Sequence, residues 1–343
     1  MQPTSDRVNN FDFLRVSAAL AVLVSHQYAL TGRPEPVPWV GSWGGLGVLV
    51  FFAVSGFLVA GSWLSDPNLL RFTIRRWLRI WPGLAVATLG VVFVLGPLVT
   101  ALPKSDYFSA SSTWSYLKLL GLWEFHEQLP GIFSGNAKSG GANGSLWTIP
   151  VEVRCYVALA MIGVLGILRQ KMAMTAMSLA LYGWFFFFSN IGYDNPLRAK
   201  LQMGIVFLAA AQLYQLRSFW MHRKFVCALC AWFVAWVAWV QGLQEISFTL
   251  GLPIFVILLG SWAAPILKDF GRFGDISYGL YIYAFPVQQT VIWIGGPSLD
   301  FLTGLAISIG ITMVLAWLSW HWIEYPALQL KGRLNRGSRS FAR

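Results

Sequence analysis

The chain has 343 residues, of which 56% are hydrophobic, 16% aromatic and only 11% charged. Soluble globular proteins carry about 25% charged residues, so this composition excludes that class and indicates a protein whose solvent is lipid. A net charge of +11 would point to nucleic acid in a soluble protein. Here Lys and Arg occur in short clusters between apolar segments, as membrane topology requires, and we expect no nucleic-acid partner.

Ten apolar segments approach the length of about 20 residues that a bilayer-spanning helix needs. In chain order they cover approximately 11–31, 45–63, 78–101, 145–168, 173–190, 200–217, 225–241, 246–266, 276–295 and 302–324. Apolar side chains surround each segment instead of alternating, which favours helices over a β-barrel. The sequence therefore predicts an all-α integral membrane protein, a bundle of about ten transmembrane helices forming a single domain over 1–343.

Lys and Arg are concentrated in alternate connections, which predicts that these connections face the cytoplasm. Both termini are then cytoplasmic, including a basic tail over about 327–343. The polar N-terminal segment lacks a small-residue cleavage site and is not expected to be a cleaved signal peptide. The longest connection, about 102–144, faces outward and ends in a run of Gly, Ser and Asn too polar to order itself firmly. It is interpreted as a flexible tether or as a lid or acceptor-binding loop.

Two ionisable residues fall within the first span, where burial of charge is costly and therefore indicates function. Arg15 and His26 lie eleven positions apart, which on a helix places them on one face, roughly 16 Å apart along the axis. Arg15 is then near the cytoplasm and His26 nearer the outer side. This arrangement suits a donor with a phosphate at one end and a reactive acyl group at the other. Imidazole can accept a hydroxyl proton near neutral pH; the alternative is that His26 bonds to a neighbouring helix.

A basic cluster precedes the third span. Arg71, Arg75 and Arg79 are spaced four apart and share a helical face, while Arg76 and Arg79 share an adjacent one. Guanidinium groups bind phosphate in bidentate fashion, which favours a site for the donor phosphates. The alternative is an anchor for lipid headgroups.

The fourth span begins with residues 143–159, in which Glu152 and Arg154 interrupt an apolar helix, and we expect both to be buried. A carboxylate at this depth must be paired or take part in the chemistry. Glu152 can orient His26, stabilise its cation or contact an acceptor hydroxyl, and these alternatives stay open. Pairing with Arg154 is disfavoured because residues two apart on a helix point to different sides.

Small residues and cysteines carry weaker signals. Ser55, beside Gly56, can bring a backbone close to a ligand, although such residues more often pack helices together in membranes. Cys155, Cys227 and Cys230 lie inside apolar segments, so we expect neither disulfides nor a metal site. His321 and Glu324 are interpreted as a polar helix end. No nucleotide-binding or zinc-hydrolase motif is present.

Six motifs, in order along nearly the whole chain, resemble those of the membrane-bound acyltransferase-3 family. They are Arg15 with His26 after ten residues, FFxxSGF at 51–57, RRxxRixP at Arg75–Pro82, LWxxxxExxxY at Leu146–Tyr156, SYxLYxxxxP at Ser277–Pro286 and EyP at Glu324–Pro326. The resemblance implies a multi-pass protein of the bacterial inner membrane. It implies acylation of a surface polysaccharide, lipopolysaccharide or glycolipid, with acetyl-CoA or another acyl-CoA as co-substrate and no permanently bound cofactor.

The resemblance also implies roles for individual residues. His26 would be catalytic, Glu152 an essential acidic partner, and Arg15, Arg76 and Arg79 contacts for the donor. We add Arg75 and Ser55 to the predicted donor-binding residues. We predict that the acceptor is bound by residues at the start of the fourth span, namely Asn143, Ser145, Trp147 and Tyr156.

The function predicted from the sequence is O-acyl transfer, with His26 as the general base. Acyl-CoA arrives from the cytoplasm and a carbohydrate hydroxyl from the outer side. The rival hypothesis is a transporter or flippase for a lipid-linked sugar, which would use the same buried charges to bind its cargo. The basic cluster on the inner side favours the enzyme.

Overall fold

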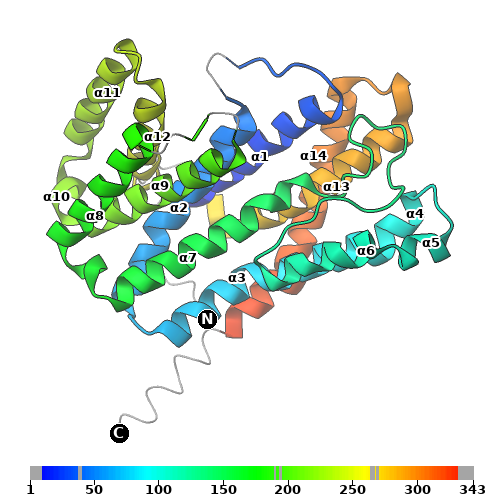
Figure 1. Ribbon diagram of the computed structural model, residues 1–343, viewed down its shortest axis with the longest axis horizontal. Helices are drawn as coiled ribbons and strands as arrows, with labels where there is room; N and C mark the ends of the chain where they lie inside the picture. The colour runs from blue at the N-terminus through cyan, green and yellow to red at the C-terminus, as the bar shows by residue number, and fades with distance from the viewer. Residues whose placement is uncertain are drawn as a thin grey trace, which may run out of the picture. The chain divides into compact units, whose positions relative to one another are not determined.

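The protein is all-helical in the part that the structure describes, which comprises residues 10–37, 41–188, 191–192, 195–262, 267 and 270–330 of this computed structural model (Figure 1). Strand pairing there is limited to two isolated bridges, Thr100 with Ile132 and Gln128 with Gly141. The predicted all-α class is confirmed. The predicted basic tail from residue 331 onward, and most of the polar N-terminal segment, lie outside the described residues.

Each of the ten predicted spans contains a helix. Seven helical segments are long and apolar enough to cross a membrane: Phe11–Leu30, Trp43–Ser65, Leu69–Val99, Gly144–Val164, Lys171–Phe188, Arg217–Val240 and Phe301–Leu330. The other three predicted spans correspond to α9 (Pro196–Gln215), α12 (Gln244–Gly260) and α13 (Ser277–Gly295). The chain is therefore a multi-pass membrane protein. These three helices are shorter or less apolar than the seven. Helix α12 has only 17 residues, and α9 and α13 carry glutamines and tyrosines that lower their mean hydropathy.

Several of these segments are made of more than one element, such as an α-helix followed by a π-turn. The individual elements are α1 (Phe11–Leu30), α2 (Trp43–Ser65), α3 (Leu69–Gly90), the π-turn η1 (Val91–Leu95), α4 (Gly96–Val99), α7 (Thr148–Val164), α8 (Lys171–Gly183), α10 (Arg217–Trp220), α11 (Lys224–Val240), α14 (Phe301–Ser319) and the π-turn η9 (Trp320–Glu324). Short helices α5 (Lys104–Ser109) and α6 (Ser111–Tyr116) and the 3-10 turn η3 (Gly144–Trp147) lie in the connection before α7.

The chain divides into two compact units. Unit 1 comprises Met1–Ala18, Val48–Phe72 and Arg154–Phe273, and unit 2 comprises Ala19–Gly47, Thr73–Val153 and Gly274–Arg343. Helices α1, α2, α3 and α7 contribute residues to both units. The expectation that the chain forms one domain stays a prediction.

Unit 1 is packed through small residues and a few polar pairs. A Cβ at Gly56 would lie 2.1 Å from the carbonyl oxygen of Phe207, so glycine lets α2 approach the backbone of α9. This contact supports the packing interpretation of the small residues beside Ser55. Polar side chains join α9 to its neighbours: Gln202 donates to Thr249 of α12 and Gln212 to Thr175 of α8. Such bonds hold helices together where lipid provides no hydrophobic driving force.

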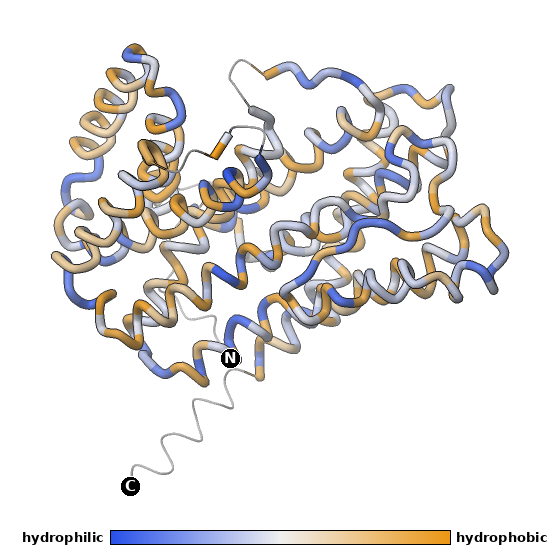
Figure 2. The backbone as a smooth tube through the Cα atoms, viewed as in Figure 1, coloured by the Kyte–Doolittle hydropathy of each residue, from blue (hydrophilic) through white to orange (hydrophobic). Residues whose placement is uncertain are grey.

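Helix α11 consists mostly of hydrophobic residues along its length (Figure 2). None of its residues is buried, and its exposed side chains include Phe225, Leu229, Trp232, Phe233 and Trp236. Water would penalise an apolar surface of this extent, whereas a bilayer would not. This exposed surface is an independent indication that the protein lies in a membrane.

In unit 2, α13 packs lengthwise against α14 (Figure 1). The approach is close because a Cβ at Gly279 would lie 2.7 Å from the Cα of Ala316. Gly83 likewise lets α3 approach α13, since a Cβ there would lie 3.0 Å from the Tyr278 ring. Helix α13 is thus packed closely against two neighbours of unit 2, and it carries most of the polar groups described below.

The connection over 102–144 is better ordered than the sequence predicts. Its residues share a small hydrophobic core with the end of the third span, formed by Val91, Val92, Val99, Tyr107, Tyr116, Leu129, Ile132, Phe133 and Ala142. Tyr107 is fully buried and donates to the carbonyl oxygen of Val92 at 3.0 Å. Burial raises the pKa of Tyr107 to about 12, so its phenol remains a donor. The expectation that this connection cannot order itself is wrong, because its aromatic residues bury themselves while its Gly-rich end is hydrogen-bonded to α13.

We predict that Gly96→Ala destabilises unit 2, whereas Gly90→Ala does not. A Cβ at Gly96 would lie 2.0 Å from Tyr107 Oη, while a Cβ at Gly90 meets nothing within 4 Å. Overpacking of this kind costs about 1–3 kcal/mol, and Gly→Ala in an open helical position gains up to about 1 kcal/mol. Thermal unfolding of the two variants in detergent measures the difference. Equal unfolding midpoints would contradict the tight contact between Gly96 and Tyr107.

Candidate active site

His26 lies on α1 within unit 2, where its imidazole contacts the side chains of Ser145 and Phe285. Ser145 Oγ lies 3.4 Å from His26 Nδ1, and the Phe285 ring meets the imidazole edge-on with centroids 5.2 Å apart. Ser145 is 1% exposed. The structure therefore brings together one predicted catalytic residue, which is half-buried, and one predicted acceptor-binding residue, which is buried.

Ser145 is held in place by the way α13 breaks its own hydrogen-bond ladder. Pro286 lies inside α13 and has no N–H, so the carbonyl of Ile282, four residues earlier, loses its helical partner. Asn143 Nδ2 donates to that carbonyl at 2.7 Å, while Asn143 Oδ1 accepts from the Ser145 backbone N–H. One buried amide thus satisfies a broken helix and starts the turn that carries Ser145.

Tyr281 holds the same turn from a second side. Its hydroxyl donates to the Ser145 carbonyl at 2.7 Å and lies 2.7 Å from Thr148 Oγ1. Since Tyr281 and Ile282 are neighbours on α13, both bonds fix the 143–148 turn to one helix. The position of Ser145 relative to His26 is therefore set by α13.

A polar seam continues along α13 past the imidazole. Gln288 Nε2 donates to the Leu23 carbonyl at 2.9 Å and to Gln27 Oε1 at 2.8 Å. Gln289 Nε2 donates to the carbonyls of Lys138 and Gly141, and Asn136 Nδ2 donates to the Gln289 carbonyl. The Gly-rich end of the 102–144 connection is therefore tied to α13.

Glu152 lies on the second turn of α7 and is half-buried. Its carboxylate interacts electrostatically with the hydroxyls of Tyr278 and Tyr281 on α13, in addition to other interactions. Through Tyr281 it is linked to the turn that carries Ser145. Its predicted role beside His26 stays a prediction.

Arg79 is engaged by acidic groups of unit 2. Its Nη2 lies 2.6 Å from Asp275 Oδ2, and its Nη1 lies 4.0 Å from Glu324 Oε2. Glu324 is 2% exposed and accepts from Ser319 Oγ at 2.9 Å. The π-turn η9 at the end of α14 accounts for this geometry, because the extra residue rotates Glu324 inward. The interpretation of Glu324 as a polar helix end is wrong: it is the buried partner of a predicted donor-binding arginine.

The other predicted site residues are distributed over both units. Arg75 and Arg76 lie half-buried on α3 in unit 2 and interact with other groups of the protein. Trp147 is half-buried in η3. In unit 1, Arg15 pairs with Asp12, the Tyr156 ring lies tilted against the Phe207 ring, and Ser55 is half-buried on α2. These predicted binding roles stay predictions.

Arg154 differs from its neighbour Glu152. Its side chain is exposed on the protein surface, so the expectation that both residues are buried is wrong for Arg154. The helix has turned by about 200° between the two positions, which places them on different sides.

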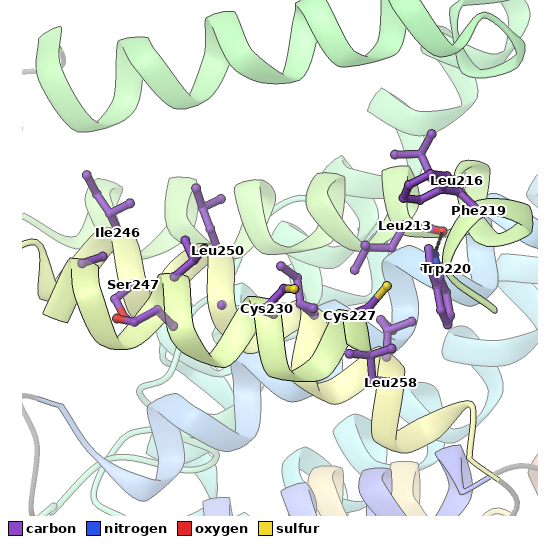
Figure 3. Close-up of a pocket in the computed structure, with 17 residues that line it drawn as sticks. Leu213, Leu216, Phe219, Trp220, Cys227, Cys230, Ile246, Ser247, Leu250 and Leu258 are labelled. Carbon is purple, nitrogen blue, oxygen red and sulfur yellow. Dashed lines mark hydrogen bonds between the residues drawn. The ribbon is translucent and has the colours of Figure 1, made fainter. Parts of the chain in front are cut away.

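Unit 1 contains an apolar cavity of about 450 Å³ between α9, α11 and α12 (Figure 3). Cys227 and Cys230 line it among leucine, isoleucine and aromatic side chains, and all three cysteines are free. The expected absence of disulfides is confirmed for these cysteines. Ser247, one of the few polar residues of its lining, donates to the Ala235 carbonyl at 2.7 Å, so its hydroxyl proton is already engaged.

The fold and site define a multi-pass helical membrane protein with a histidine-centred polar site in unit 2. The profile of the acyltransferase-3 family, described as an acyltransferase domain, matches residues 8–321. The chain therefore belongs to the acyltransferase-3 family and is a membrane-bound acyltransferase. This result favours the enzyme over the transporter or flippase that the sequence left open.

Two characterised relatives extend over nearly the full length. An O-acetyl transferase of Shigella phage Sf6 is 30% identical over 327 residues, covering 92% of this chain and 95% of that protein. Nodulation protein 10 of Rhizobium leguminosarum bv. viciae is 28% identical over 363 residues, covering 96% of each. No solved structure matches the chain significantly.

The glutamines of the seam are not among the site residues predicted from the sequence. Gln27, Gln288 and Gln289 are each fully buried, and a pair of adjacent glutamines in the middle of an apolar span was the available signal. Uncharged amides in a span are costly without partners, so the same reasoning that singled out His26 applies to them.

Proposed function

We propose that the protein is an O-acetyltransferase that moves an acetyl group from cytoplasmic acetyl-CoA to a hydroxyl of an extracytoplasmic carbohydrate. The observation that carries the proposal is the contact between His26 Nδ1 and Ser145 Oγ inside a membrane protein of this family. The name of the phage relative, an O-acetyl transferase, supports the acetyl group. We also propose that the chain crosses the bacterial inner membrane ten times, with both termini in the cytoplasm.

His26 is the general base in this mechanism. With Nδ1 protonated and donating to Ser145 Oγ, Nε2 has a free lone pair and can accept the proton of an acceptor hydroxyl. The acceptor oxygen attacks the thioester carbonyl carbon, and the carbon–sulfur bond breaks. The departing CoA thiolate takes the proton from the imidazolium, so that the products are the acetyl ester and CoA with a free thiol.

The donor is bound from the cytoplasmic side. Arg15, Arg75 and Arg76 bind its phosphates, with Ser55 beside the pantetheine arm and Arg79 as a further candidate already engaged by Asp275 and Glu324. Guanidinium groups recognise phosphate by paired hydrogen bonds. Glu152 acts from α7 on Tyr281, whose hydroxyl positions Ser145. The acceptor contacts Trp147 and Tyr156, while Asn143 and Ser145 shape the turn.

An acetyl-transfer assay tests the proposal. Purified protein in detergent receives acetyl-CoA labelled in the acetyl group, together with surface carbohydrate extracted from cells that lack the gene. We expect label to enter the carbohydrate as a base-labile ester, with one CoA thiol released per ester formed. Labelled protein without labelled carbohydrate, or thiol release that never depends on the carbohydrate, would contradict the proposal.

A further inference from the structure

A second cavity, of about 520 Å³, lies in unit 2 and is bordered by three segments. These are the last turn of α1 with the residues after it, the loop 134–137, and the turn between α13 and α14. All three lie on the outer side in the predicted topology. The volume falls within the range of about 300–1,000 Å³ that holds small ligands.

The cavity lies further along the two helices that flank the histidine. Leu30 lines it and lies four residues after His26, hence on the same face of α1 one turn further out. Ile292 lines it from α13 and lies seven residues after Phe285, the ring packed on the imidazole. Two helices therefore lead from the imidazole to the cavity, over a distance of one to two turns, or roughly 5–11 Å.

Gln27, which lines the cavity, has an unsatisfied hydrogen-bond donor. Gln27 is 0% exposed, and its Nε2 has no hydrogen-bond partner among the described residues. Its amide orientation is fixed: Gln288 Nε2 donates to the Leu23 carbonyl, which can only accept, and also to Gln27 Oε1. Gln27 Oε1 must therefore face Gln288, and Nε2 faces elsewhere.

The free nitrogen faces Gly304 of α14, beside one residue that lines the cavity. A Cβ at Gly304 would lie 3.2 Å from Gln27 Nε2 and 3.0 Å from the side chain of Leu299, which lines the cavity. A buried N–H without an acceptor is costly, and a ligand oxygen would remove that cost. A donor of this kind indicates a ligand that carries acceptor oxygens.

The remaining lining groups narrow the class of ligand. Asp300 accepts backbone N–H bonds from Leu302 and Thr303; the bond from Thr303 is the main cause of its lowered pKa, so this carboxylate stays an acceptor. Arg33 lies over the Phe301 ring, 5.1 Å from its centroid, and Trp293 is 39% exposed at the cavity. Donors, acceptors and aromatic rings together fit a sugar, whose hydroxyls both donate and accept and whose C–H faces pack on rings.

We propose that this cavity binds a sugar ring of the acceptor, with Gln27 Nε2 donating to a ring oxygen or hydroxyl while a neighbouring hydroxyl reaches His26. The inference rests on the proposed function and identifies an acceptor subsite outside the residues predicted from the sequence. The apolar cavity of unit 1 offers no comparable set of donors and acceptors, which makes it unsuitable for this ligand.

Steady-state kinetics with two variants test the subsite. The acceptor probe is the extracted surface carbohydrate described above, and Gln27→Met and Trp293→Ala remove the free donor and the exposed ring. We expect each to raise the apparent KM for the carbohydrate about tenfold or more, while the KM for acetyl-CoA stays within about twofold.

Ile294→Ala is the matched control, since Ile294 is 72% exposed beside Trp293 and does not line the cavity. It should behave as wild type. Unchanged carbohydrate KM in both cavity variants, or equal rises in both KM values, would overturn the subsite while leaving the proposed function standing. A wild-type protein that transfers no label would instead overturn the proposed function and the subsite with it. Because Trp293 is a surface residue, its variant remains informative if Gln27→Met fails to fold.

Discussion

His26→Ala is expected to lower kcat for acetyl transfer by about 10²–10⁴-fold, the usual contribution of a positioned general base. The imidazole is the titratable group that the structure places against Ser145, and alanine can neither accept the hydroxyl proton nor return it to the leaving thiolate. The KM for acetyl-CoA should change little, because the predicted phosphate contacts are unaffected. Single-turnover transfer of labelled acetyl groups in detergent measures the effect.

His222→Ala is the control for this experiment. His222 is exposed in a 3-10 turn of unit 1, so its loss should leave both kcat and thermal stability unchanged. Ser145→Ala should give an intermediate loss, because the imidazole keeps its base but loses the partner that holds its orientation. A folded His26→Ala protein that keeps wild-type kcat would show that the histidine only bonds to a neighbouring helix.

Arg79→Ala is expected to destabilise unit 2 by about 3–5 kcal/mol, because it leaves a buried acidic group without its counter-charge. Glu324 is 2% exposed, and Asp275 loses its 2.6 Å ion pair in the same variant. Thermal unfolding in detergent should show a large drop in midpoint. Arg79→Ala combined with Glu324→Gln should recover much of that loss, since the neutral amide keeps the Ser319 hydroxyl as a partner.

Arg71→Ala provides the comparison on the same helix. Arg71 pairs with Asp66, and the two side chains are 31% and 23% exposed, so we expect a much smaller loss of stability, because solvent screens an exposed ion pair. If Arg79→Ala unfolds like wild type and raises only the KM for acetyl-CoA, Arg79 is a donor ligand, as the sequence motif implies. The buried ion-pair network would then have no structural role.

Much of the fold follows from apolar length alone. Each predicted span contains a helix because about 20 apolar residues in lipid have one way to satisfy their backbone groups. His26, Glu152 and the α3 arginines became candidate site residues because they are ionisable and lie within or beside apolar spans, where burial of charge is rare enough to be informative. Hydropathy failed for the 102–144 connection, where aromatic residues such as Tyr107 build a core that average polarity hides.

The pairing of side chains could not be predicted, because it depends on contacts distant in sequence. Asn143 meets Ile282 only because Pro286 opens the ladder of α13, and this requires knowing which helix packs on the 143–148 turn. Glu324 meets Arg79 only because a π-turn redirects it, and a 3.6-residue period predicts a different face. Spacing within one helix predicts the face on which a side chain lies. Which side chain it contacts depends on the tertiary fold.

The central claim is that transfer takes place at His26, and an experimental structure of the protein with a non-hydrolysable acetyl-CoA analogue tests it most directly. The mechanism predicts the acetyl carbonyl carbon beside the imidazole, leaving room for an acceptor oxygen within about 3–3.5 Å of that carbon and in hydrogen-bond reach of Nε2. An analogue bound with its acetyl group far from His26, on a path that the imidazole cannot reach, would contradict the claim.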